Sequence, residues 1–179
     1  MTIDDIPNAI EHLFLCGFND YNCDRLTFSI NSFNQLKSIS IGDHCFQNVR
    51  EFVIDGLESL ESVKIVFECF RIDYKKRDDG VCRITNCPNL RQLEIGDHSF
   101  ADFKSFELSN INSLQSINFS EWCFKYAEDF SLKGEWKERK KCDLNESEND
   151  VLDLPSLEIV TFGGRSFAKC HVAVFESMR

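Results

Sequence analysis

Two hexamers carry the residue types that could form a catalytic or metal site. IGDHCF spans residues 41–46, and IGDHSF spans residues 95–100. A carboxylate beside an imidazole can bind a metal ion or transfer a proton, and Cys45 beside His44 adds a candidate nucleophile and its base. Neighbouring residues in an extended turn point apart, however, and no third residue that would orient the histidine is indicated. The chemistry therefore depends on whether the fold brings the two hexamers together.

Cysteine is the second reactive residue type. The chain has nine cysteines but no Cys-x-x-Cys pair of the kind that holds zinc. Because the number is odd and the N-terminus lacks the features of a secretory signal, we expect free thiols in a reducing compartment. Thiols stacked in a column that oxidises or binds a soft metal are the alternative.

Composition and charge restrict the class of partner. The 179 residues suffice for one domain with a core, and the formal charge of −10 disfavours nucleic acid and anionic membranes as partners. No apolar stretch approaches the roughly 18 residues that a membrane-spanning helix needs. We expect a cytoplasmic protein with a protein partner, no nucleic acid and no membrane insertion. If the chain is a fragment of a longer secreted protein, the cell surface is the alternative.

A repeat of about 24 residues organises the chain. Each copy contains two short stretches of apolar period two, which is typical of half-buried strands. Stacked copies would pair each strand with its counterpart and bury a common core. We predict one mainly β repeat solenoid over residues 1–179, with about six coils of roughly 24 residues and two short strands per coil. An antiparallel sandwich is the alternative. The copies begin at Ile10, Leu36, Leu60, Leu90, Leu114 and Leu157, and the last is incomplete.

The repeated segments resemble a known family. LRQLEIGDHSF, LQSINF and LPSLEIVTFGGRSF are similar to leucine-rich repeats, most of all to the short BspA-like type, whose copies begin L-x-x-I-x-I. The resemblance extends from Ile10 to the end of the chain and implies a binding scaffold that uses its strand-lined surface. It departs from the common leucine-rich repeat because no regular asparagine follows the first strand.

The repeat changes the interpretation of the two hexamers. A whole copy lies between them, which separates the Asp-His pairs by roughly 10 Å at the usual strand spacing. Metal ligands must converge within about 2 to 2.6 Å of one ion, so we expect no shared metal site. We expect positive φ at Gly42 and Gly96, and we expect Asp43 and Asp97 to cap the turn that follows each glycine. In the core we expect Phe46 and Phe100.

The position of the cysteines in the repeat favours a structural role. Three of them precede the recurring phenylalanine, where other copies have serine, and Cys82 and Cys87 take the places of core residues. Small buried thiols behave in this way. We therefore expect no enzyme, no catalytic residue and no cofactor. The three are Cys45, Cys69 and Cys123, and the serines are Ser99 and Ser166.

Two insertions lengthen the repeat. Residues 71–81 add a short segment, and residues 135–153 form a long charged segment with a basic and an acidic half. Either is a tolerated surface loop or a contact arm for a partner. The candidate contact residues of the long insertion are an aromatic anchor and its basic neighbours: Trp136, Lys137, Arg139, Lys140 and Lys141.

Outward positions of the first strand form two predicted columns of candidate binding residues. We expect charge pairing along the first column, between Lys37 and Glu61 and between Glu61 and Arg91. The first column contains Lys37, Glu61, Arg91 and Gln115 and continues to Glu158, and the second contains Ser40, Lys64, Glu94 and Asn118 and continues to Thr161; the first four of each are the candidate binding residues.

Three functions are compatible with these features. A non-enzymatic protein-interaction module, such as an intracellular scaffold or adaptor, would bind through the strand-lined face, the insertion at 135–153, or both. A cell-surface adhesion or recognition protein is the second, as the resemblance allows for some BspA-like proteins. The third is a self-assembling structural subunit, because an incomplete last copy leaves an open coil end with exposed strand edge.

Overall fold

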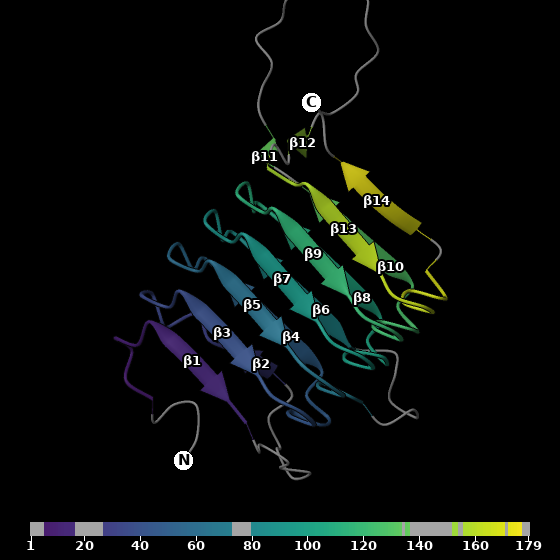
Figure 1. Ribbon diagram of the computed structural model, residues 1–179, viewed down its shortest axis with the longest axis horizontal. Helices are drawn as coiled ribbons and strands as arrows, with labels where there is room; N and C mark the ends of the chain where they lie inside the picture. Colours follow the sequence, from purple (N-terminus) through teal and green to yellow (C-terminus); the bar gives the residue numbers. More distant parts are fainter. Residues whose placement is uncertain are drawn as a thin grey trace, which may run out of the picture.

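Two parallel β-sheets make up the fold in the computed structural model (Figure 1). The structure describes residues 6–16, 27–72, 80–133, 135–136, 152–153, 156–170 and 172–176, and no helix occurs in these ranges. Sheet A contains, in spatial order, β1 (His12–Leu15), β3 (Ser38–Ile41), β5 (Ser62–Ile65), β7 (Gln92–Ile95), β9 (Ser116–Phe119) and β13 (Ile159–Phe162). Sheet B contains β2 (Thr27–Ser29), β4 (Glu51–Asp55), β6 (Val81–Thr85), β8 (Ser105–Ser109), β10 (Asp129–Lys133) and β14 (Val172–Glu176).

The chain alternates between the sheets, so each copy of the repeat contributes one strand to each. The pairing aligns equivalent apolar positions: Ile39 lies beside Val63, and Val63 lies beside Leu93. Burial alternates along the strands with period two, which is the pattern expected of strands with one face in a core. The predicted mainly β architecture is confirmed, as two parallel sheets of short strands. The antiparallel sandwich is wrong, because both large sheets are parallel.

A column of stacked phenylalanine rings fills the core beside the turns that follow sheet A. Consecutive ring centroids are 5.2, 4.6, 5.0 and 5.1 Å apart, close to the spacing of adjacent strands. The prediction that Phe46 and Phe100 lie in the core is confirmed, since both are buried. Because stacking copies share this column, it sets the register of one copy against the next. Its members are Phe46, Phe70, Phe100, Phe124 and Phe167.

Candidate binding surfaces

The sheet A face is the outward side of sheet A together with the residue directly before each of β3, β5, β7 and β9. The register places Ser40 beside Lys64 and continues through Glu94 to Asn118. One position before each strand, the backbone N–H of Glu61 donates to the carbonyl of Lys37 at 2.8 Å, and the same bond joins Arg91 to Glu61 and Gln115 to Arg91. The structure therefore brings all eight predicted residues of the first strand into two columns.

Charge pairing on the sheet A face differs from the prediction. Lys37 pairs with Glu11 of the preceding copy at 2.9 Å, not with Glu61. This hydrogen bond raises the pKa of Lys37 and lowers the pKa of Glu11. The pairing between copies that does occur joins Lys64 to Glu94 at 2.9 Å. Long side chains reach in either direction along a column, so the strand register alone does not select the partner.

Sheet B ends in a polar network that the sequence did not predict. The Asp55 carboxylate accepts hydrogen bonds from the Thr85 hydroxyl and the Asn86 amide, both at 2.7 Å, and these bonds lower the pKa of Asp55. The Asn110 amide in turn donates to the Asn86 side chain at 2.7 Å. Both asparagines have positive φ, as does Gly56. An asparagine ladder thus follows the second strand of the copy, and the recurrence of Asn or Gly at this position was the available signal.

The glycines of the two hexamers lie in the turns for a different reason from the one predicted. Positive φ occurs at His44, Phe46, His98 and Phe100 rather than at Gly42 or Gly96. A Cβ atom on Gly96 would lie 1.9 Å from the Val66 carbonyl oxygen of the preceding copy. Gly96 is therefore required by the close approach of two backbones.

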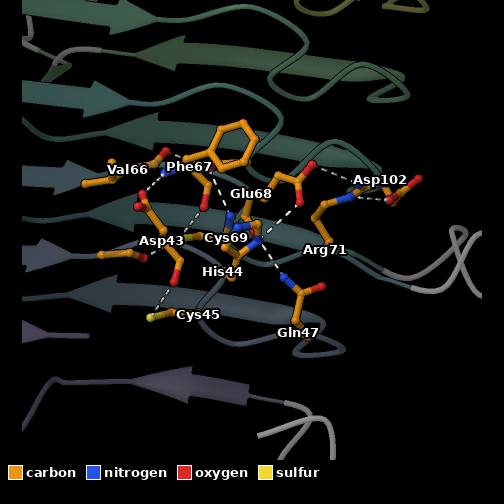
Figure 2. A network of polar contacts seen from close by, with 12 residues as sticks. Asp43, His44, Cys45, Gln47, Val66, Phe67, Glu68, Cys69, Arg71 and Asp102 are labelled. Atoms are coloured by element: carbon orange, nitrogen blue, oxygen red, sulfur yellow. Dashed lines mark hydrogen bonds and ion pairs between the residues drawn. The ribbon is translucent and has the colours of Figure 1, made fainter. Parts of the chain in front are cut away.

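The aspartates of the hexamers join adjacent copies instead of capping their own turns. The Asp43 carboxylate accepts a hydrogen bond from the backbone N–H of Phe67 at 3.2 Å (Figure 2). The Asp97 carboxylate accepts one from the backbone N–H of Glu121 at 2.9 Å. Both donors lie one copy further along the chain. The prediction that each aspartate caps its own turn is therefore wrong, because the backbone N–H groups that these carboxylates accept from belong to the next copy.

An aromatic ring separates the two histidines. The Phe67 centroid lies 5.3 Å from the His44 ring and 5.9 Å from the His98 ring. His44 Nδ1 contacts the Glu68 carboxylate at 3.2 Å, and Glu68 also contacts Arg71 at 3.6 Å, as Figure 2 shows. Among the described residues, no group of three or more His, Cys, Asp or Glu side chains is placed to hold a metal ion.

The thiols are hydrogen-bonding groups of the core. Cys69 donates to the Gly42 carbonyl at 2.9 Å, and Cys123 donates to the Gly96 carbonyl at 3.0 Å. Ser99 makes the same bond to Val66 at 3.1 Å, which explains why cysteine and serine exchange at this position. Burial raises the pKa of Cys69 and of Cys123 to about 12. None of the seven cysteines in the described ranges forms a disulfide bond.

The insertions lie largely outside the described residues. At the ends of the long insertion, β11 (Glu135–Trp136) pairs with β12 (Leu152–Asp153) as an antiparallel ladder. The backbone of Trp136 is thus placed. The predicted contact residues Lys137, Arg139, Lys140 and Lys141 fall outside the described ranges, as do residues 73–79 of the short insertion.

Comparisons with known proteins identify no family. The chain matches no family model, and no curated protein or solved structure compared with it gives a significant match. The described part of the chain has no helix that is long and apolar enough to cross a membrane.

Proposed function

We propose that the chain is a leucine-rich-repeat solenoid of the BspA-like type that acts inside the cell as a non-enzymatic protein-interaction module. The observation that supports this most is the sheet A face. Its columns run over consecutive strands without interruption and combine hydroxyl, amide and charged side chains. Such a surface can hold an extended partner region, because stacked repeats offer breadth rather than a cavity.

The reactive groups support a binding role over a catalytic one. A thiolate is the nucleophilic form of cysteine, and burial raises the pKa of the Cys87 thiol to about 11 and that of Cys82 well above its usual value. These thiols stay protonated near neutral pH. Buried free cysteines also fit a reducing compartment.

Site-specific photocrosslinking in cell extract tests this proposal. A photoreactive amino acid at Asn118 on the sheet A face should yield a discrete crosslinked species, whereas the same group at Glu107 on the outer side of sheet B should not. Exchanging charges with Lys64→Glu and Glu94→Lys keeps an ion pair possible but alters the face, and it should remove the species. Equal crosslinking from both positions, or none from Asn118, would contradict the proposal.

Self-assembly is a second candidate because β13 is the last strand of sheet A in the described part of the chain and carries an exposed apolar side chain. At β13, Phe162 is 44% exposed, whereas Leu15, at the same register position in the strand at the opposite end of the sheet, is only 2% exposed. Within the described residues β13 pairs with β9 alone, so its other edge offers free backbone groups. Light scattering over a concentration series tests this candidate. A mass fixed at 20.8 kDa at all concentrations rules it out.

A further inference from the structure

A group of cations and aromatic rings lies on the turns after β9 and β13. We call it the Trp122 cluster; it contains Trp122, Lys125, Tyr126, Arg165 and Lys169. Lys125 Nζ lies 4.3 Å from the Trp122 centroid and 4.7 Å from the Tyr126 centroid. Arg165 Cζ lies 4.5 Å from the Trp122 centroid, and Lys169 Nζ lies 5.0 Å from that of Tyr126. Two adjacent copies therefore place three positive charges around two rings.

No carboxylate of the described residues forms an ion pair with these three cations. Other basic residues of the structure do have such partners: Lys64 pairs with Glu94, Arg83 with Glu107, and Lys104 with Glu128. Glu121 is the acidic residue of the same turn, and its carboxyl carbon lies 4.0 Å from the Cβ position of Gly164. In a chain of net charge −10, three cations held together with no ion pair to a described carboxylate are an exception.

The geometry favours an anionic ligand over one that stacks on a ring. The Trp122 ring stacks on His98 of the preceding copy, with centroids 5.6 Å apart and an interplanar angle of 8°. Arg165 of the following copy also lies over this ring. Because His98 and Arg165 already contact the indole ring, a sugar or a base would have to displace one of them in order to stack there. The cations, by contrast, are held in place by the rings, so an anion would meet a preorganised site.

We propose that the Trp122 cluster binds a short acidic segment of a protein partner through its carboxylate or phosphoryl groups. The net charge of −10 disfavours an anionic membrane or a nucleic acid, because an extended polyanion would also meet the acidic remainder of the surface. A short segment needs only the local field. This proposal adds a surface to the proposed function and does not depend on the sheet A face.

Fluorescence titration of Trp122 tests the proposal. Trp136→Phe leaves Trp122 as the one tryptophan, and the probes are hexaglutamate, a serine peptide with three phosphoserines, and hexaglutamine as the neutral control. We expect saturable binding of an acidic probe at 50 mM salt and at least tenfold weaker binding after combined Lys125→Gln, Arg165→Gln and Lys169→Gln substitution. The acidic probe that binds more tightly identifies the source of the anion. Lys125→Arg with Lys169→Arg retains the charges and should retain binding.

A matched control removes three positive charges elsewhere. Arg83→Gln, Lys104→Gln and Lys133→Gln together should weaken binding less than twofold, since they change the net charge equally but none of the three residues lies over the Trp122 or Tyr126 ring. Equal weakening by both triple variants would overturn the proposal, as would equal binding of hexaglutamine or no binding of either acidic probe. Binding to phosphatidylserine vesicles without binding to the peptides would also overturn it, in favour of a membrane surface. Crosslinking from Asn118 reads out the sheet A face separately.

Discussion

Replacing Gly96 by alanine should separate two copies of the repeat. The new Cβ would lie 1.9 Å from the Val66 carbonyl oxygen, whereas carbon and carbonyl oxygen normally approach to about 3.3 Å. Relief of this overlap needs a shift of more than about 1 Å. The hydrogen bond from the Gly96 N–H to the Ile65 carbonyl, 2.7 Å long, crosses the same contact and would break. With about 1 kcal/mol for the bond and about 1 to 3 kcal/mol for overpacking, Gly96→Ala should cost about 2 to 4 kcal/mol.

Gly164→Ala is the matched control for this substitution. It makes the same chemical change in the corresponding turn of the last copy, but the nearest atoms, those of the Glu121 carboxylate, are 4.0 Å from its Cβ position. Its φ lies outside the positive range, so alanine should be neutral or stabilise by up to about 1 kcal/mol through the unfolded state. Urea unfolding followed by circular dichroism gives both free energies. If Gly96→Ala lay within about 0.5 kcal/mol of Gly164→Ala, backbone approach could not be the reason for glycine.

Three further perturbations test the core, the thiols and the polar network. Phe100→Ala, in the middle of the phenylalanine column, should lower the free energy of unfolding by about 3 to 5 kcal/mol. The control Phe14→Ala, at a 67% exposed position, should change it by less than about 1 kcal/mol. Similar urea midpoints for the two variants would contradict the stacked core. Ellman titration at pH 8 should label Cys69 and Cys123 only after denaturation, because burial raises the pKa of each thiol to about 12. Rapid labelling of these two thiols in the folded protein would refute their burial. The pKa of Asp55 is lower in the folded protein than in the unfolded chain, so the ionised carboxylate stabilises the fold above about pH 4, and this stabilisation is lost as pH falls through the lowered pKa. Asp55→Asn should therefore make the free energy of unfolding less dependent on pH in this range. An unchanged pH profile would exclude the network.

The sequence predicts the strands well because their signal is local and repeated. Apolar residues of period two mark β3 and β4, and the equivalent positions recur in every later copy. The buried phenylalanine column follows from the same alignment, since Phe46, Phe70 and Phe100 occupy one repeat position. Stacking of identical positions is the simplest way to bury all of them at once.

Turn geometry and charge pairing are not local, and here the predictions were partly wrong. A glycine permits positive φ, but it also permits two backbones to approach, and only the position of Val66 in the preceding copy distinguishes these uses at Gly96. Lys37 could reach Glu11 or Glu61, because both lie one strand spacing away. The Trp122 cluster joins copies whose starts are 43 residues apart, so no local pattern indicates that Lys125 and Arg165 meet over one ring.

One repeat position in the turns after the sheet A strands combines a strained backbone with side chains that differ from copy to copy. His44, Glu68, His98, Trp122 and Arg165 share one repeat position, and all have φ between 51° and 62°. A non-glycine residue in this conformation costs of order 1 kcal/mol, which glycine or asparagine would avoid. The contacts of these side chains offset that cost: His44 pairs with Glu68, while Trp122 stacks on His98 and receives Arg165. The residue types in this column are therefore selected by what they touch. The column changes from a histidine beside a carboxylate, His44 with Glu68, to a cation over an indole, Arg165 with Trp122. A repeat that holds its core positions constant can in this way present different chemistry along a single edge.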